Sequence, residues 1–305
     1  GGSSDPGTAD STYPEIVEGI SDVVDVSVGR DHICAVDTAQ DVFCWGDNHN
    51  IIVGGPDTVT SPHEMQIDGI VDLDAGAYAT CAIHGNWEQL SCWGTRLAGD
   101  KPAPTQTLVD IAVGKEHACF AREDGKVVCW ATTSAIEGQR GTGTPLDGLS
   151  DIVELAAGYE HNCARTSSGS VLCWGENENG QLGQLPSDSA AESEIPLEVP
   201  GIDDAIKVVA GRTYSCALRE GGKLSCWGGV EGEDEGWYDE SDLVAPSWSP
   251  FGLATGVIEV AAGYQHTCAL KDNGKVWCWG SNGYGELGYG DTSTGEEQPV
   301  EVSFE

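Results

Sequence analysis

The chain has 305 residues, of which 50 are acidic and 14 are basic, and its formal net charge at pH 7 is −36. Such a charge repels the phosphate backbone of nucleic acids, so we expect no nucleic-acid partner. No run of about 18 apolar residues occurs, so we expect no membrane-spanning helix. Residues 1–12 are small, polar and acidic. They predict a flexible spacer, which could tether the rest of the chain to a lipid anchor or to a preceding domain.

Six copies of one unit come after the spacer, each with two cysteines and a tryptophan directly after the second cysteine. Five pairs have nine residues between the cysteines, and only Cys81 and Cys92 have one more. A period of about 40–50 residues indicates a repeat architecture, in which single units cannot bury both of their faces. The hairpin units lie near residues 23–49, 71–95, 110–132, 152–183, 206–229 and 257–289.

The last unit reads most clearly as short strands. Val257 to Ala261 alternates apolar and polar residues, and His266–Lys271 and Lys275–Trp279 are joined by a loop that ends in Gly274. Folding about this loop places the two cysteines opposite each other, within reach of a disulfide. Zinc ligands, the alternative, are usually two to four residues apart, so the spacing favours disulfides. The predicted bridges are Cys34–Cys44, Cys81–Cys92, Cys119–Cys129, Cys163–Cys173, Cys216–Cys226 and Cys268–Cys278.

Two hairpins depart from the pattern. The first has Gln40 where the others have glycine, so we expect a strained turn or a different turn type. The second has a four-residue loop, which accounts for the extra residue between its cysteines.

These units predict an all-β, six-bladed β-propeller over residues 13–305, with one disulfide inside each blade. A proline near a short apolar run, typical of the outer strand, occurs seven times, whereas six blades need six. We therefore expect terminal strands to close the ring, with either the first copy (13–20) or the last (298–302) pairing across the termini.

The repeat resembles that of the regulator of chromosome condensation propeller family. The motif is G-x-x-H-x-C-A-L, a short turn, then C-W-G-x-N-x-x-G-E-L-G, and Gly158–Gly183 and Gly263–Gly288 match it best. The resemblance covers roughly residues 12–305 and implies a binding scaffold without naming its target. The best-known members have seven blades, one of them a nuclear exchange factor that binds chromatin. The paired cysteines instead resemble an extracellular, mostly bacterial branch, which includes a propeller that inhibits β-lactamases.

Four histidines and six tryptophans recur at equivalent places. His32, His117, His161 and His266 each stand three residues after a glycine. They could be metal ligands, but equivalent positions on different blades lie far apart, so we expect each to bond the backbone locally. The tryptophans could stack on sugars, but we expect them to fill the space between blades.

The loops after each tryptophan vary most and predict the binding face. The loop of the fifth unit, residues 229–247, combines aromatic and acidic residues, which are typical of an interface anchor. Acidic loops leave weak calcium binding open, although no calcium-loop motif is present. We expect no catalytic residues, no metal site and no cofactor. The candidate binding residues are Trp237, Tyr238, Trp248, Glu233, Asp234, Glu235 and Asp239.

Six intramolecular disulfides need an oxidising compartment, which predicts a secreted, periplasmic or cell-surface protein, with a lipoprotein included. The resulting hypothesis is a non-catalytic scaffold that binds an extracellular protein or a surface polymer, and a cationic partner would suit the charge. Three alternatives stay open: an inhibitor of an extracellular enzyme, a carbohydrate-binding lectin, and a structural component of a surface assembly.

Overall fold

The computed structural model describes residues 12–47, 58–95, 97, 104, 106–131, 145–184, 191–229, 255–292 and 295–302. Over these ranges the chain forms short strands and no helix, including no helix that could span a membrane. The strands are β1 (Val23–Val28), β2 (His32–Asp37), β3 (Val42–Asp47), β4 (Thr58–Met65), β5 (Ile70–Ala75), β6 (Ala79–His84), β7 (Gln89–Gly94), β8 (Leu108–Val113), β9 (His117–Arg122), β10 (Val127–Ala131), β11 (Ile152–Ala157), β12 (His161–Thr166), β13 (Val171–Glu176), β14 (Glu192–Glu198), β15 (Ala205–Ala210), β16 (Tyr214–Arg219), β17 (Lys223–Gly228), β18 (Val257–Ala262), β19 (His266–Lys271), β20 (Val276–Gly280) and β21 (Glu296–Glu301).

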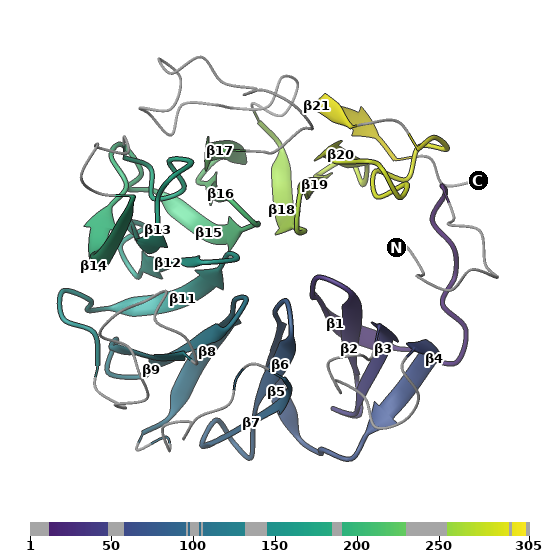
Figure 1. The fold of residues 1–305 in the computed structure, drawn as a ribbon, viewed down its shortest axis with the longest axis horizontal. Coiled ribbons are helices and arrows are strands. Elements are labelled where there is room, and N and C mark those ends of the chain that lie inside the picture. Colours follow the sequence, from purple (N-terminus) through teal and green to yellow (C-terminus); the bar gives the residue numbers. More distant parts are fainter. Residues whose placement is uncertain are drawn as a thin grey trace. The chain divides into compact units, whose positions relative to one another are not determined.

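The strands form six antiparallel sheets, each built on one predicted hairpin (Figure 1). The sheet orders are β1-β2-β3-β4, β5-β6-β7, β8-β9-β10, β11-β12-β13-β14, β15-β16-β17 and β18-β19-β20-β21. In every hairpin the two cysteines are register partners, for example Cys34 with Cys44. All six predicted disulfides are present, with Cα atoms 4.0–4.1 Å apart. The predicted all-β class with one disulfide per blade is confirmed.

The hairpin turns have the predicted chemistry. Gly125, Gly169 and Gly274 have φ values of +75°, +92° and +80°, a region that disfavours residues with a side chain. Gln40 has to adopt the same conformation, with φ +67°, which confirms the expected strain in the first hairpin. The four-residue loop of the second hairpin carries positive φ values at three successive residues, the last of them Trp87 at +69°.

The first strand of the repeat carries a bulge at its second residue. The register shifts between the first and third residues of the strand, as between Ile70 and Asp72 in β5, and the same shift occurs in β1, β8, β15 and β18. A bulge twists the strand and redirects its side chains. In β5 the first and fourth residues, Ile70 and Leu73, are then buried, whereas Asp72 and Asp74 are only partly buried.

The chain divides into two compact units. The N-terminal unit contains residues 16–160, and the C-terminal unit contains residues 161–302 together with residues 12–15. Within the C-terminal unit the carbonyl of Thr12 accepts a 2.9 Å hydrogen bond from the amide of Gly290, beyond β20. The single propeller over residues 13–305 and the closure of its ring by terminal strands stay predictions, and residues 1–11 of the predicted spacer lie outside the described part.

The cores of both units lie between neighbouring sheets. In the N-terminal unit one cluster joins Val36 and the Cys34–Cys44 bridge to Ile70 and Leu73 of β5. In the C-terminal unit the Cys216–Cys226 bridge packs in the same way against Val257 and Val260 of β18. Most of the repeated tryptophans are buried, at 5% exposure or less for Trp130, Trp174, Trp227 and Trp279. This supports the expectation that they fill the space between blades.

Candidate functional site

The predicted binding residues Trp237, Tyr238, Trp248, Glu233, Asp234, Glu235 and Asp239 all lie in residues 230–250, outside the part of the chain that the structure describes. The residue that leads into this segment is described. The amide of Gly229, just after β17, donates a 3.0 Å hydrogen bond to the carbonyl of Thr213, in the turn between β15 and β16. The binding site formed by the predicted residues therefore stays a prediction, but Gly229, where the segment that contains them begins, is held in place by this bond.

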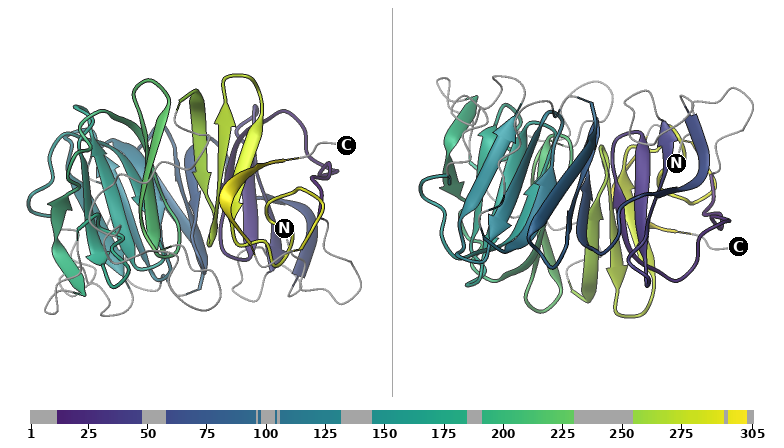
Figure 2. Two further views of the ribbon diagram at one scale, coloured as in Figure 1. Left: turned by 90° about the horizontal axis from the view of Figure 1, so that it is seen from above. Right: turned by 90° about the horizontal axis from the view of Figure 1, so that it is seen from below.

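In each repeat, the turn that joins the first strand to the second lies at one end of the sheet. The variable loop that comes after the third strand starts at the same end. The bond from Gly229 to Thr213 recurs from Asp47 to Asp31 at 2.8 Å and from Ser281 to Gln265 at 2.8 Å. We call this end of the sheets the turn end, because it carries the turns at residues 29–32, 76–79, 114–117, 158–161, 211–214 and 263–266. Figure 2 shows strands of single sheets edge-on, running between their two ends. The opposite end carries the hairpin loops.

Basic residues lie over tyrosines at the turn end. In the N-terminal unit, Arg30 lies 5.9 Å from the ring centroid of Tyr78, and the ammonium of Lys115 lies 4.5 Å from that of Tyr159. In the C-terminal unit, Arg212 lies 5.3 Å from the ring centroid of Tyr264. Each pair joins the turns of two neighbouring sheets. Cation–π contacts of this kind are worth about 0.5–1 kcal/mol at exposed sites.

Backbone hydrogen bonds fix the same neighbouring turns to each other. The amide of Arg212 donates to the carbonyl of Tyr264 at 2.9 Å, and the amide of Lys115 donates to that of Tyr159 at 3.0 Å. Lys115 is also paired with Glu160, whose carboxylate is the main reason that the pKa of the ammonium is raised. The turn end is therefore held in place by main-chain as well as side-chain contacts.

In four of the turns, the glycine that opens the turn is required by the ring three residues later. A Cβ atom on Gly114 or Gly263 would overlap the imidazole of His117 or His266, and one on Gly211 would overlap the ring of Tyr214. None of these three glycines has a positive φ, so the constraint is close approach and not backbone conformation. This explains the G-x-x-H part of the repeat.

Two of the four repeated histidines, His32 and His161, bond side chains of the next sheet, which corrects our expectation of local backbone partners for these two. The Nε2 atom of His32 lies 2.7 Å from Oγ1 of Thr80, and Nε2 of His161 lies 2.9 Å from Oγ of Ser215. The hydroxyl stands one residue before the first cysteine of the next repeat, so the contact spans about one repeat length. Burial lowers the pKa of His32 to about 4, so the ring is neutral at pH 7.

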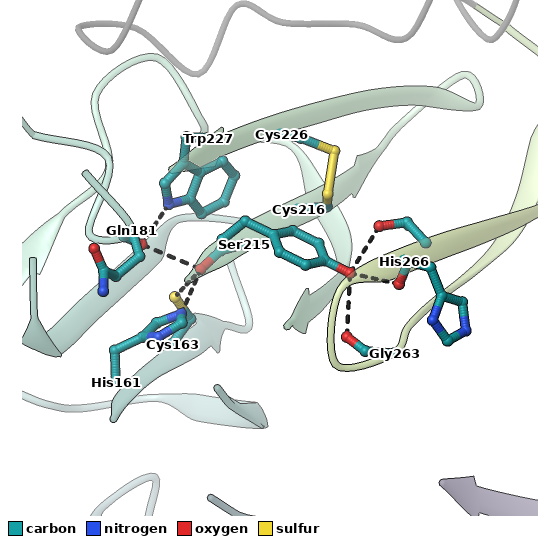
Figure 3. The surroundings of a disulfide bond; sticks show 11 residues. His161, Cys163, Gln181, Ser215, Cys216, Cys226, Trp227, Gly263 and His266 are labelled. Carbon is teal, nitrogen blue, oxygen red and sulfur yellow. Dashed lines mark hydrogen bonds between the residues drawn. A yellow bond between two sulfur atoms is a disulfide. The ribbon is translucent and has the colours of Figure 1, made fainter. Parts of the chain in front are cut away.

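We call the boundary between two neighbouring sheets a seam. Around Ser215, several side-chain and backbone contacts across one seam form a connected network (Figure 3). The Ser215 hydroxyl donates a 3.1 Å hydrogen bond to the carbonyl of Gln181, which also accepts a 2.9 Å bond from Nε1 of Trp227. The same hydroxyl lies 3.4 Å from Sγ of Cys163. Gln181 belongs to the G-Q-L-G segment of the repeat, so this segment ties the tryptophan and the serine of the following repeat together.

A tyrosine takes the place of histidine in the next seam of the C-terminal unit. The hydroxyl of Tyr214 donates to the carbonyl of His266 at 2.6 Å and accepts from the hydroxyl of Thr267 at 2.8 Å. These side chains are buried and satisfy one another, which is the arrangement of a structural core and not of a ligand site. Within the described ranges, no three His, Cys, Asp or Glu side chains gather as they would around a metal ion.

Comparison with known proteins shows where the repeats lie. Two family models, both described as the regulator of chromosome condensation (RCC1) repeat, together match more than half of the chain. One matches residues 23–51, 108–130, 152–181 and 257–286, and the other matches residues 168–218 and 273–305.

Three curated proteins are similar in sequence. Protein pim1 of Schizosaccharomyces pombe is 25% identical over 264 residues, which are 78% of this chain and 42% of that protein. The ultraviolet-B receptor UVR8 of Arabidopsis thaliana is 26% identical over 312 residues, which are 92% of this chain and 70% of that protein. Probable E3 ubiquitin-protein ligase HERC6 of Homo sapiens is 33% identical over 134 residues, which are 42% of this chain. The chain spans less than half the length of pim1 and 12% of HERC6.

Solved structures share the fold. Human WBSCR16 superposes with a TM-score of 0.79 at 18% identity, covering 96% of this chain and 84% of that one. Yeast RCC1 (Prp20), bound to Kap60, superposes with a TM-score of 0.77 at 22% identity, covering 92% of this chain and 75% of that one. The ectodomain of the Arabidopsis thaliana receptor kinase ACR4 reaches 0.56 at 20% identity, covering 93% and 83%. At such identities the likeness shows the fold alone, which is that of a repeat propeller.

Proposed function

We propose, because the chain belongs to the regulator of chromosome condensation repeat family, that it is a non-catalytic scaffold that binds another protein through the turn end of its sheets. The observation that carries this proposal is the contrast at that end. The turns are fixed by backbone bonds between neighbouring sheets, such as Arg212 to Tyr264, whereas the loops that start beside them differ in length and composition. A rigid frame with divergent loops is typical of binding folds.

The segment after Gly229 supplies the proposed contact residues. Its sequence places Trp237 and Tyr238 among acidic residues, and aromatic anchors within a polar rim are characteristic of protein interfaces. Yeast RCC1 was crystallised bound to another protein, Kap60, which supports protein binding by this fold without naming a partner for this chain. The net charge of −36 would attract a cationic partner.

The proposed compartment is outside the reducing cytosol, at a cell surface, in a periplasm or in the medium. All twelve cysteines are paired in disulfides, and reducing compartments do not maintain such a set. The likeness to a receptor-kinase ectodomain supports this location. Peptide mapping of the protein purified from its native source, without reductant, should recover the six hairpin bridges, and free thiols there would contradict the proposed location.

The binding proposal is tested by replacing Trp237 and Tyr238 together with alanine. The intact chain is used as bait on the native surface fraction, and a recovered protein is then purified and titrated by biolayer interferometry. We expect at least a tenfold loss of affinity with an unchanged melting temperature. Ile258→Ala is the control, because Ile258 is an exposed apolar residue of the C-terminal unit at the beginning of β18, away from the turn end. Unchanged affinity in the double variant would remove this loop from the interface, and failure to find any protein partner would overturn the function.

A further inference from the structure

A pocket lies between the first two sheets of the N-terminal unit, at the opposite end from the turn end. Its volume is about 450 Å³, within the range of ligand sites. Val24 and Val71, at the beginnings of β1 and β5, line it, whereas the turn with Arg30 comes after the end of β1. The pocket is therefore distinct from the binding end proposed above.

Both irregular hairpin loops of the chain border this pocket. Gln40, from the turn that lacks the usual glycine, and Trp87, from the loop with an extra residue, are lining residues. Both have left-handed backbone conformations, with φ values of +67° and +69°. For a bulky residue such as tryptophan this conformation is a genuine outlier, and outliers of this kind cluster at functional sites. Two independent departures from the repeat thus meet at one cavity.

The lining combines carboxylates with apolar walls. Asp25, Asp37 and Asp72 contribute the carboxylates, and the described lining contains no lysine, arginine or histidine. The aspartates bond backbone amides: Asp25 accepts from Val26 at 2.9 Å and Asp72 from Ile111 at 3.1 Å. These donors are neutral, so the described lining keeps its negative charge.

The electrostatics of Asp72 favour a positively charged ligand beside it. Its pKa is raised to about 6, first by burial and then by the nearby charges of Asp74 and Asp25, while the hydrogen bond from Asp110 lowers it. The charged groups that act on it are Asp74 on β5 itself and Asp25 on β1 and Asp110 on β8, the first strands of the two neighbouring sheets. A positively charged ligand would oppose these effects and favour the ionised form.

We propose that this pocket binds an arginine-bearing segment of a partner protein. A guanidinium can pair with a carboxylate through two parallel hydrogen bonds and stack on the face of a tryptophan, which suits Asp25 and Trp87. Its aliphatic stem can cover apolar side chains such as Val24, which is 63% exposed. The volume accommodates a short stretch of two or three residues. This second site extends the proposed scaffold function to the hairpin end of the N-terminal unit.

The test titrates the whole chain by calorimetry with the peptide acetyl-Gly-Arg-Gly-Arg-Gly-amide at low salt. The same peptide with citrulline in place of arginine is the neutral isostere. We expect saturable one-to-one binding of the arginine peptide and at least tenfold weaker binding of the citrulline peptide. Equal binding of both peptides, or none, would overturn the proposal.

Matched variants locate the site. Asp25→Asn and Trp87→Asn should each weaken the arginine peptide at least fivefold, and the second replaces an outlier with a residue that tolerates positive φ. Glu123→Gln, an equal change of charge on an exposed hairpin turn of another sheet, should leave binding unchanged. An equal loss of affinity in this control would show that the peptide is attracted by net charge alone, and it would refute the proposed pocket site.

The pH dependence and the partner separate this site from the proposed function. Binding should weaken severalfold from pH 7.5 to pH 5, because Asp72 is protonated below about 6. A pH-independent affinity would contradict the participation of Asp72.

Partner capture that depends on Trp237 and Tyr238, together with no binding of the arginine peptide, would reject only the pocket. Peptide binding that depends on Asp25 in a chain without a protein partner would reject only the scaffold function.

Discussion

The two units use the same backbone register but different chemistry to join neighbouring sheets. In the N-terminal unit, the third residue of the first strand is acidic and bonds the next sheet: Asp72 accepts the amide of Ile111, and Asp110 accepts that of Leu155. Asp74, two residues further along, accepts the amide of Val113 at 2.6 Å. Carboxylates thus clamp successive sheets through their main chain.

The C-terminal unit has no such clamp among its described residues. The equivalent positions in β15 and β18 are Lys207 and Glu259, which form a side-chain ion pair with each other. Its seams depend instead on buried hydroxyls, those of Ser215 and Tyr214. The comparison teaches that the third position of the first strand can join neighbouring sheets either by a carboxylate bonded to the backbone or by a side-chain ion pair, and that the two units should respond differently to pH and to mutation.

The largest expected effect is common to both units. Replacing Cys81 and Cys92 together with alanine, or Cys216 and Cys226, should each lower the free energy of unfolding by about 2–4 kcal/mol, because each bridge closes a short hairpin loop and lies in a core. Chemical denaturation of each variant is the measurement. A large loss in one unit and none in the other would show that only one unit depends on its disulfides.

Removing the Tyr214 hydroxyl should damage the C-terminal unit selectively. Tyr214→Phe leaves the carbonyl of His266 and the hydroxyl of Thr267 without this buried partner, which costs about 1–3 kcal/mol. Hydrogen exchange read by mass spectrometry should show faster exchange in β18 and β19. Thr80→Val, which removes the partner of His32 in the N-terminal unit, is the matched comparison. Faster exchange in the N-terminal unit from Tyr214→Phe would contradict separate seams.

Acidification should favour the N-terminal unit over the C-terminal unit. The pKa values of Asp72 and Asp74 are raised to about 6, so their stabilising contribution is complete below about 4 and is lost as the pH rises through 6. The pKa values of His32 and His266 are lowered by burial, so their contribution is lost as the pH falls below about 6.5. In the N-terminal unit, the effect of Asp72 and Asp74 opposes that of His32. In the C-terminal unit, only the histidine effect, that of His266, is present among these groups.

The measurement is hydrogen exchange of both units at pH 7 and pH 5, corrected for the intrinsic rate. We expect the N-terminal unit to gain on the order of 1 kcal/mol relative to the C-terminal unit at pH 5, because partial exposure of the aspartates reduces the full effect. Asp72→Asn imitates the protonated form and should reduce the difference. Parallel pH responses of the two units would refute this assignment.

The smallest expected effect is at the turn end. Arg212→Ala and Lys115→Ala remove the cation from one pair in each unit, and each should cost about 0.5–1 kcal/mol. The melting temperature at low and high salt is the measurement. Because Lys115 is also paired with Glu160, its loss should shrink more with salt than that of Arg212. An equal salt response would show that the ion pair adds nothing.

The amino-acid sequence carries a signal for part of the seams. Where a repeat has a histidine that bonds a hydroxyl, His32 or His161, the next repeat has a hydroxyl residue directly before its first cysteine, Thr80 or Ser215. Where a repeat has Ala79 in place of the histidine, the next repeat has Ala118 at that position. This pairing of one repeat with the next is readable, although our expectation of local backbone partners overlooked it. The pocket had a signal too, since Gln40 and the long second loop are visibly irregular, but nothing in the sequence placed them at one cavity.

The sequence by itself determined the all-β hairpins, the six disulfide pairs and the family, because a two-residue alternation, a fixed loop length and a repeated motif are local properties of the chain. Tertiary structure alone decided that Asp72 meets Asp110 and that Gln40 and Trp87 line one pocket. Those contacts join residues about one repeat apart, and their distances depend on the twist and packing of whole sheets, which no local pattern encodes.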